Sequence, residues 1–434
     1  MTPSARLSAA IEILADIEAR RRPAADALKD WGLSHRFAGS GDRAALAGLV
    51  YDTLRRRASA RWLMDSEAPR AALIGMLVLQ RGETIETLDA LFTGERFAPE
   101  PLTEDERKAL AERKLEQAAP DIQADVPNWL WSSFEAAFGE DAIAEGRALA
   151  ERAPVDLRVN TLKASRDKLL TELEPLHASA TPLSRWGVRV PLGPDGRSPA
   201  IQSEESFQKG WFEVQDEGSQ LAGLVAAARP GEQVLDLCAG GGGKTLEFAA
   251  AMENKGQVFA TDSDKRRLAP IHDRLARAGV RNVQVRTPRG RVSGGGPAID
   301  DLDGRMDLVL VDAPCSGSGT WRRSPDTKWR MRPSSLADRQ KDQTAVLRAG
   351  ARAVKPGGRL VFVTCSVLPE ENDASVKAFL ADHADYTAAP LSELAKGAGL
   401  SAFARFGSSG GTGLQLSPHR SGTDGFFIAL LHRA

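Results

Sequence analysis

The first third of the chain repeats apolar residues at the spacing of an α-helix. Residues 4–20 place Leu7, Ala10, Ile11, Leu14 and Ile17 on one helix face. The same period predicts further helices over 42–55, 71–80, 83–92, 104–118 and 127–150, and no strand pattern interrupts them. We therefore predict an all-α domain over residues 1–145.

The pattern changes after this domain. Residues 155–162 alternate like a half-buried strand, a helix is predicted over 166–174, and Gly187-Val-Arg-Val-Pro is typical of a second strand. These elements predict a small α/β segment over residues 146–215.

Strands and helices then alternate to the end of the chain. Six strands are predicted at 233–238, 257–261, 283–286, 307–312, 359–364 and 425–432, with a weaker seventh at 385–388. Such alternation is typical of a doubly wound, mostly parallel sheet with helices on both faces. The expected fold class is therefore α/β, with a seven-stranded Rossmann-like sheet over residues 216–434.

Composition narrows the class of protein. Hydrophobic residues make up 42% and charged residues 26%, which are ordinary values for a soluble protein. No apolar run reaches about eighteen residues and no signal peptide is evident, so we expect a cytoplasmic protein without a membrane partner. Cys238, Cys315 and Cys365 fit neither a disulfide framework nor a zinc site. We expect reduced thiols, no metal and a monomer.

Charge is distributed unevenly behind a net charge of −1. Residues 91–150 contain 13 acidic and 6 basic residues, whereas 320–360 contain 11 basic and 3 acidic ones. Residues 264–291 add 9 basic against 2 acidic residues. A polyanion responds to such local fields, so the positive segments are predicted to contact RNA phosphates. Two solvated helical faces are the alternative interpretation.

A glycine run after the first long-sheet strand predicts a cofactor site. Gly240 to Gly243 leave the backbone open to a ligand and permit positive φ, and the next helix offers free N–H groups. A Walker A loop needs glycine where Cys238 stands, and a dinucleotide fold prefers spaced glycines. Asp236 before the run suits the amine of S-adenosylmethionine, and Asp262 at the next strand tip can accept both ribose hydroxyls.

Two cysteines follow the ends of predicted neighbouring strands. Cys315 follows Asp312-Ala-Pro, and Cys365 follows the strand at 359–364. Since adjacent strands lie about 4.8 Å apart, both thiols can meet one substrate. C5 of a pyrimidine becomes nucleophilic only after a thiolate adds to C6, and a second group must then take the C5 proton. Spacing does not assign these roles, and a small buried cysteine is the alternative interpretation, above all for Cys238.

Cationic neighbours are expected to lower the pKa of such thiols. The candidates are Lys244, Arg322, Arg323 and Lys328.

Four motifs in this order resemble the Sun/Nop2/RsmB family of RNA cytosine-C5 methyltransferases, and most of all its bacterial ribosomal RNA members. They are Asp236-Leu-Cys-Ala with Gly-Gly-Lys-Thr, Asp312-Ala-Pro-Cys-Ser-Gly-Ser-Gly-Thr, Arg323-Ser-Pro-Asp-Thr-Lys-Trp and Val363-Thr-Cys-Ser-Val-Leu-Pro-Glu-Glu-Asn. The resemblance covers nearly the whole chain. It implies a NusB-like RNA-binding fold for residues 1–145 and RNA recognition by residues 146–215.

The resemblance also implies site roles. Cys365 is the nucleophile, Cys315 assists elimination, and Lys244 and Asp312 lie against the target base. The cofactor contacts are Cys238, Ala239, Gly240, Gly241, Gly242, Gly243, Lys244, Asp262, Thr287 and Asp312.

Two departures from the family pattern stand out. The family usually has Ala-Pro where this chain has Gly240-Gly241, and an acid where it has Thr287, which lies near Arg286 and Arg289. The implied function is S-adenosylmethionine-dependent methylation of C5 of a cytidine in RNA, expected to be ribosomal RNA, through a covalent adduct of a cysteine with C6. A non-catalytic RNA-binding ribosome-assembly factor with a degenerate methyltransferase fold is the alternative.

Overall fold

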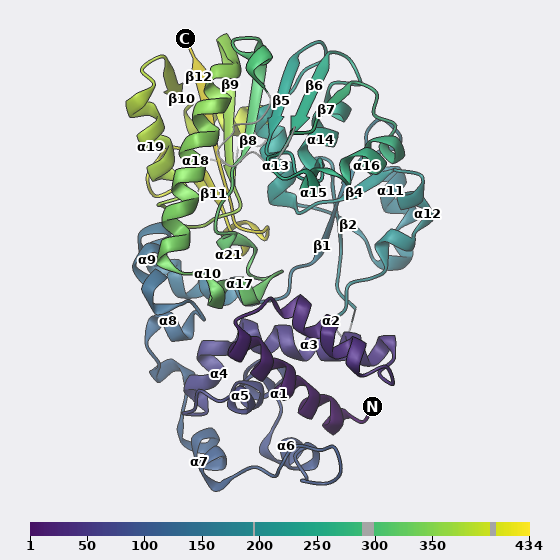
Figure 1. The fold of residues 1–434 in the computed structure, drawn as a ribbon, viewed down its shortest axis with the longest axis vertical. Helices are drawn as coiled ribbons and strands as arrows, with labels where there is room; N and C mark the ends of the chain where they lie inside the picture. Colours follow the sequence, from purple (N-terminus) through teal and green to yellow (C-terminus); the bar gives the residue numbers. More distant parts are fainter. Residues whose placement is uncertain (194–195, 289–298, 400–404) are drawn as a thin grey trace. The chain divides into compact units, whose positions relative to one another are not determined.

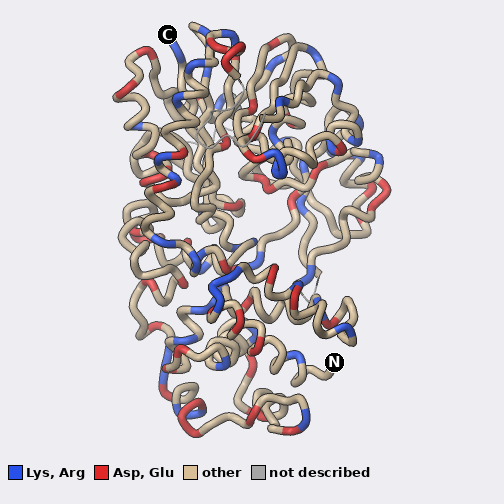
Figure 2. The backbone as a smooth tube through the Cα atoms, viewed as in Figure 1, with Lys and Arg blue, Asp and Glu red and all other residues tan. Residues whose placement is uncertain are grey.

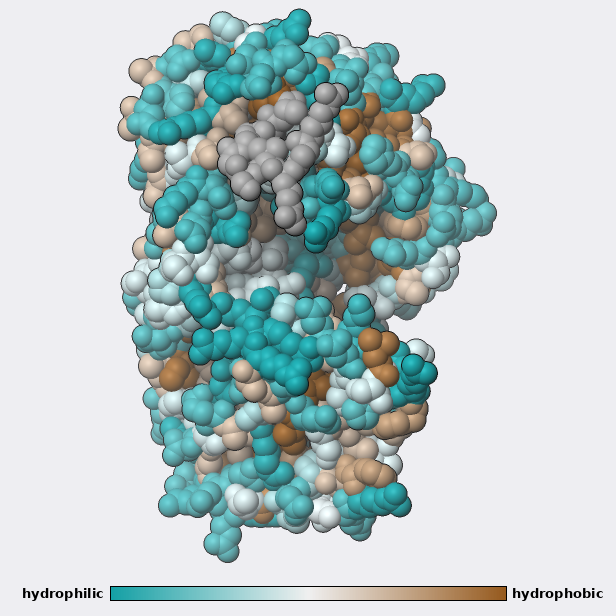
Figure 3. Space-filling model, in the orientation of Figure 1, coloured by the Kyte–Doolittle hydropathy of each residue, from teal (hydrophilic) through white to brown (hydrophobic). Residues whose placement is uncertain are grey.

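The computed structural model describes residues 1–193, 196–288, 299–399 and 405–434. The chain divides into two compact units (Figure 1). A helical unit comprises residues 1–152 with 320–331, and an α/β unit comprises residues 153–319 with 332–434. None of the described helices is both long and apolar enough to cross a membrane, and the face drawn in Figure 3 is mainly hydrophilic.

The helical unit buries the apolar faces that the sequence predicts. Its α-helices are α1 (Pro3–Arg20), α2 (Ala24–Ser34), α3 (Ser40–Arg55), α4 (Arg57–Leu63), α5 (Pro69–Arg81), α6 (Ile85–Leu91), α7 (Glu104–Glu112), α8 (Pro120–Gln123), α9 (Trp131–Phe138), α10 (Ala142–Leu149) and α17 (Pro325–Arg330). The pattern missed α2, α4, α8 and α17. The single helix predicted over 127–150 is wrong in part, because Gly139 adopts a φ of +57° between α9 and α10.

Residues 320–331 complete the core of this unit. The Trp321 side chain is 1% exposed and stacks on Phe134, with ring centroids 5.6 Å apart and planes 10° apart. The Arg322 carbonyl accepts a hydrogen bond from Arg55 Nη2 at 2.8 Å, and the Trp329 indole N–H donates to the Leu54 carbonyl at 2.6 Å. A segment that follows the Cys315 loop in sequence is therefore folded with the amino-terminal helices.

The α/β unit begins with a small antiparallel sheet. Its strands are β1 (Val155–Val159), β2 (Ser179–Ala180), β3 (Gly187–Val190) and β4 (Phe212–Val214), in the order β2-β3-β1-β4. Helices α11 (Arg166–Glu172) and α12 (Glu205–Gln208) accompany it. The core of this sheet includes Leu157, Leu169, Val188 and Phe212. The predicted strands at 155 and 187 are present, and β4 was missed.

The large sheet contains all seven predicted strands. They are β5 (Gln233–Leu237), β6 (Gln257–Thr261), β7 (Val283–Arg286), β8 (Met306–Asp312), β9 (Val354–Thr364), β10 (Tyr386–Ala388) and β12 (Phe426–Arg433), in the order β10-β12-β9-β8-β5-β6-β7. An eighth, β11 (Leu414–Leu416), pairs with β12 and was not predicted. The strands from β9 to β7 in this order are parallel, and β12 is antiparallel to β9. The predicted α/β class is confirmed.

Helices cover both faces of the large sheet. On one face, α13 (Glu217–Ala226), α14 (Gly243–Ala251) and α20 (Leu391–Ala398) pack on alternate strand residues such as Val234 and Leu310. On the other, α18 (Pro333–Ala353) and α19 (Asp373–Asp382) pack on their neighbours Leu235 and Val309. Helices α15 (Lys265–Leu268), α16 (Ile271–Ala278) and α21 (Pro418–Ser421) complete the unit. Because both faces are covered, the carboxyl ends of the parallel strands are where a ligand can bind.

Candidate active site

The two predicted catalytic thiols lie side by side. Strands β8 and β9 are parallel neighbours, and their register pairs Asp312 with Val363. Cys315 and Cys365 follow the two strand ends, and their Sγ atoms are 3.4 Å apart. Both side chains are half-buried. The two sulfurs are therefore close enough to contact two adjacent carbon atoms of one substrate.

The loop after Cys315 is bonded to the segment after Cys365. The Ser316 N–H and hydroxyl donate to the Glu371 carboxylate at 2.7 and 2.6 Å. The Gly319 N–H donates to the Cys365 carbonyl at 3.0 Å. These bonds hold the two strand extensions together. Sequence reasoning did not assign Glu371, although it lies in the Pro-Glu-Glu-Asn part of a quoted motif.

The surroundings of Cys315 raise the pKa of its thiol. The hydrogen bond with Cys365 is the largest cause, followed by burial, and the Glu371 carboxylate adds to them. The expectation of a lowered thiol pKa is therefore wrong for Cys315. Of the cations predicted to lower it, Lys244 is bonded to a carboxylate, and the others, Arg322, Arg323 and Lys328, belong to the helical unit.

A buried lysine, Lys244, forms an ion pair with the half-buried Asp312 at the edge of the sheet. The lysine lies in the first turn of α14, and its Nζ donates to Asp312 Oδ2 at 2.8 Å. Burial acts to lower the pKa of Lys244, but Asp312 and two further carboxylates, Asp236 and Glu247, outweigh it and raise that pKa. The pair thus presents a fixed ammonium group and a carboxylate, which can orient the polar edge of a base.

The glycine run forms a tight turn between β5 and α14. Gly240 and Gly242 adopt φ of +50° and +80°, and a Cβ on Gly242 would lie 2.5 Å from Ile271 Cγ1. Cys238 also adopts a positive φ, +76°, which is uncommon for a residue with a side chain. Burial raises the pKa of the Cys238 thiol, so this cysteine is a poor nucleophile. The turn leaves bare backbone where the cofactor was predicted.

Two buried carboxylates accompany this turn. Asp262 accepts the N–H groups of Gly240 and Asp264 at 2.9 and 2.8 Å. Asp236 Oδ2 accepts the Thr245 hydroxyl at 2.6 Å, while Oδ1 is buried and has no partner among the described residues. Burial raises the pKa of Asp236 to about 7. An unpaired carboxylate oxygen, a second acid and bare backbone fit the amine, ribose and chain of S-adenosylmethionine.

Thr287 follows β7 directly and is exposed. The neighbouring Arg286 is bonded to Asp301 at 2.5 and 2.9 Å and lies 4.8 Å over the Phe259 ring, so its charge is already balanced. Arg289 lies outside the described residues. A contact of Thr287 with the cofactor stays a prediction.

The positive charge expected over residues 320–360 is largely paired with carboxylates. Figure 2 shows how basic and acidic residues are interleaved along the backbone as a whole. The ion pairs are Arg330–Asp326, Arg339–Asp342, Lys341–Asp338, Arg348–Asp382, Arg352–Asp300, Lys355–Asp307 and Arg359–Glu232. Four of these acids lie outside the segment, so a local count overestimates its field. In the segment 264–291, Lys265, Arg266 and Arg267 on α15 are exposed.

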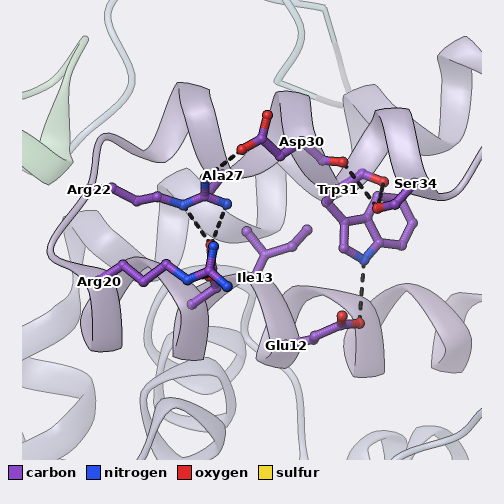
Figure 4. Close-up of a pocket in the computed structure, with 9 residues that line it drawn as sticks. Glu12, Ile13, Arg20, Arg22, Ala27, Asp30, Trp31 and Ser34 are labelled. Carbon is purple, nitrogen blue, oxygen red and sulfur yellow. Dashed lines mark hydrogen bonds and ion pairs between the residues drawn. The ribbon is translucent and has the colours of Figure 1, made fainter.

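A separate pocket in the helical unit has different chemistry (Figure 4). It is lined by residues of α1 and α2 together with Arg22. Arg22 donates to Asp16 and Asp30 at 2.7 and 2.5 Å, and the Trp31 indole donates to Glu12 at 3.3 Å. Its polar groups satisfy one another, and none of the predicted site residues lines it.

Comparison with known proteins finds similar methyltransferases. A family model described as 16S rRNA methyltransferase RsmB/F matches residues 224–432, and one for the ferredoxin-like domain of RsmF/B-like methyltransferases matches residues 126–192. The probable ribosomal RNA small subunit methyltransferase B of Synechocystis sp. is 34% identical over 313 residues, covering 72% of this chain and 68% of that protein. The corresponding methyltransferase B of Sodalis glossinidius is 36% identical over 336 residues, covering 73% and 70%.

Solved structures share the fold. The crystal structure of PH0851 has a TM-score of 0.72 and 26% identity, and the match covers 100% of this chain and 99% of that one. A methyltransferase homolog protein from Pyrococcus horikoshii has a TM-score of 0.58 and 29% identity, covering 73% and 98%. The chain therefore belongs to the RsmB/F family of methyltransferases, and its cofactor is S-adenosyl-L-methionine.

Proposed function

We propose that this protein methylates C5 of a cytidine in ribosomal RNA through a covalent adduct with Cys365. The observation that carries the proposal is the 3.4 Å separation of the Cys315 and Cys365 sulfurs at neighbouring strand ends. Methylation of an amine or a hydroxyl needs no thiol, whereas methylation of C5 needs one group to activate the ring and another to release the product. The relatives named as ribosomal RNA methyltransferases support RNA as the substrate.

Cys365 begins the reaction in this proposal. Its thiolate adds to C6, and the electron pair of the C5–C6 double bond moves to C5. S-adenosylmethionine, when bound, supplies the methyl group that C5 takes up. Cys315, after its own thiol proton has passed to water, takes the C5 proton on its sulfur. The C5–C6 double bond then re-forms, and Cys365 leaves as the thiolate that began the cycle.

The raised pKa of Cys315 supports this division of roles. The thiolate is the attacking form of cysteine, and a raised pKa makes Cys315 the less available thiolate but the stronger base, which suits it to take the C5 proton. The attack is therefore assigned to Cys365. Lys244 and Asp312 would hold the base, and the bare turn with Asp236 and Asp262 would hold the cofactor.

The target cytidine must be unstacked for C5 and C6 to enter a protein site. We assign RNA binding to a NusB-like domain over residues 1–145 and to the segment 146–215. The exposed cations Lys265, Arg266 and Arg267 would contact phosphates.

Substitution of each thiol tests the proposal. Incubated with unmethylated ribosomal RNA and S-adenosylmethionine, Cys315→Ala should accumulate a covalent protein–RNA band on a denaturing gel, because the adduct forms but is not released. Cys365→Ala should form none. The double variant Cys315→Ala/Cys365→Ala is the control, since loss of the band there places the bond on Cys365.

The opposite pattern of bands would exchange the two roles. Absence of any adduct with a protein that binds S-adenosylmethionine would overturn C5 chemistry. Bisulfite sequencing of RNA from cells without the protein then identifies the cytidine.

A further inference from the structure

Two arginines from other elements donate hydrogen bonds to backbone carbonyl groups of the glycine turn. Arg274 Nη1, on α16, donates to the Gly241 carbonyl at 2.6 Å. Arg158 Nη1, on β1, donates to the Gly243 carbonyl at 2.7 Å. Glycine loses more conformational freedom on folding than any other residue, so a turn of four glycines carries a large entropic cost when it is fixed in one conformation. These two bonds therefore restrain the most flexible backbone of the predicted cofactor site.

The small sheet fixes both arginines in turn. Glu213 on β4 is 3% exposed and accepts Arg274 Nε and Nη2 at 3.1 and 2.9 Å through one oxygen. Its other oxygen accepts Arg277 at 2.5 Å. Arg158, also 3% exposed, donates to Glu247 on α14 at 3.2 Å. The turn is thus connected, through buried charged groups, to the sheet that precedes it in the chain.

Arg274 also occupies the space beside the turn. A Cβ built on Gly241 would lie 3.0 Å from Arg274 Nη1, which is closer than ordinary van der Waals contact. A side chain at position 241 and the guanidinium of Arg274 therefore compete for the same volume. Either a side chain at position 241 or the Arg274 guanidinium is sufficient to limit the backbone conformations of the turn.

We propose that Arg274 is a positioning residue for S-adenosylmethionine, which fixes the glycine turn through the Gly241 carbonyl while Glu213 of the small sheet holds its guanidinium. The restraint acts before the cofactor arrives. Binding to a turn that already has its final conformation costs less entropy, so affinity is higher than for a free turn. The small sheet thereby acts on cofactor binding as well as on any RNA contact.

The test measures cofactor affinity in the full-length protein without RNA. By isothermal titration with S-adenosylmethionine, Arg274→Ala should raise Kd about tenfold, the effect of losing one hydrogen bond from a charged group. Arg274→Lys, which can still donate to the Gly241 carbonyl, should recover part of the affinity. Arg277→Ala is the matched control, because Arg277 shares the Glu213 carboxylate and the α16 helix and its described hydrogen bonds do not include the turn. Its Kd should stay within about twofold of the wild-type value.

A second substitution separates this role from a general loss of structure. Proline fixes φ, so Gly241→Pro should restore most of the affinity in the Arg274→Ala background, where the guanidinium no longer fills that space. Gly241→Ala is the alternative if proline prevents folding. An unchanged Kd for Arg274→Ala, or an equal loss for Arg277→Ala, would overturn the proposal.

Hydrogen exchange gives an answer that does not depend on the cofactor. In the cofactor-free protein, the amides of residues 240–244 should exchange faster in Arg274→Ala than in the wild type. Equal exchange rates would contradict the restraint itself. Failure of the wild type to bind S-adenosylmethionine would instead contradict the cofactor assignment, so the two failures are distinguishable.

Discussion

At the scale of single residues, buried polar side chains fix the two loops that carry Cys315 and Cys365. Glu371 is 0% exposed, and burial raises the pKa of its carboxyl group while the two bonds from Ser316 oppose that rise. On the next residue, the Asn372 side chain accepts the Thr364 hydroxyl at 2.6 Å and donates to the Ser366 carbonyl at 3.0 Å. The turn after Cys365 is therefore an internally bonded support for both thiol loops.

The first residue-scale prediction concerns the titration of Cys315. The hydrogen bond with Cys365 is the largest cause of its raised pKa, so Cys365→Ala should lower that pKa. The pH at which iodoacetamide alkylates Cys315 at half its maximal rate, followed by peptide mass spectrometry, should move to lower values. Glu371→Gln should move it in the same direction by less. Cys365→Ser is the control, because its hydroxyl preserves a hydrogen-bond partner; a shift as large as in Cys365→Ala would contradict this explanation.

Sequence reasoning was effective for residues at strand ends. Cys315, Cys365 and Asp312 were selected because parallel strands end at one edge, and the structure places the two thiols together there. Glu371 and Arg274 were missed because their partners, Ser316 and Gly241, lie 55 and 33 positions away. No periodicity or local spacing connects residues that far apart. The pKa of Cys315 was misjudged for the same reason, since the expected cations have partners that only the fold determines.

At the scale of elements, central strands such as β5 and β8 were predicted well because each is a short, largely apolar run covered on both faces. β11 was missed because its three residues are too few for a pattern, and α4 because its apolar face is short. The local charge count failed for a related reason: ion pairs join α18 and β9 to acids elsewhere in the chain, such as Arg348 to Asp382.

The element-scale prediction concerns α17, which contributes Lys328 to the helical unit. Lys328 is 1% exposed, and burial lowers the pKa of its ammonium group to about 8. Between that pH and about 10.4, the unfolded chain still binds the proton that the folded chain has released. The unfolded state then binds more protons, so stability should rise with pH in this window. Lys328→Met should lack this rise.

The measurement is the midpoint temperature of thermal unfolding at pH 7.5, 8.5 and 9.5. These values begin just below the titration window and extend over more than half of it. Other groups titrate in the same range, so the difference between wild type and variant is the quantity to compare. Lys29→Met is the control, because Lys29 is an exposed lysine on α2 of the same unit. Parallel profiles for the wild type and Lys328→Met would contradict a buried, weakened ammonium group.

At the scale of the whole molecule, the chain enters the helical unit twice. Gly319 is bonded on both sides to the α/β unit, through its N–H to the Cys365 carbonyl and through its carbonyl to the Gly425 N–H at 2.8 Å. The next residue begins the segment 320–331, which belongs to the helical unit. Hydrophobic periodicity describes contiguous stretches, so no pattern could show that this segment folds with helices as far as 275 positions earlier. The quoted motif Arg323-Ser-Pro-Asp-Thr-Lys-Trp thus has a structural role besides any contact with RNA.

This connectivity predicts that Trp321→Ala destabilises one unit and spares the other. Replacing a buried tryptophan stacked on Phe134 should cost the helical unit about 3–5 kcal/mol, seen as faster amide exchange in α9 and α10. Trp129→Ala is the matched control, because Trp129 is 37% exposed in the same unit. The Kd for S-adenosylmethionine should stay unchanged in both variants, because the residues proposed to hold the cofactor, which are the glycine turn, Asp236 and Asp262, belong to the α/β unit. The bonds of Gly319 hold the thiol loop in that unit. A higher Kd in Trp321→Ala alone would mean that unfolding in the helical unit lowers cofactor affinity despite these bonds.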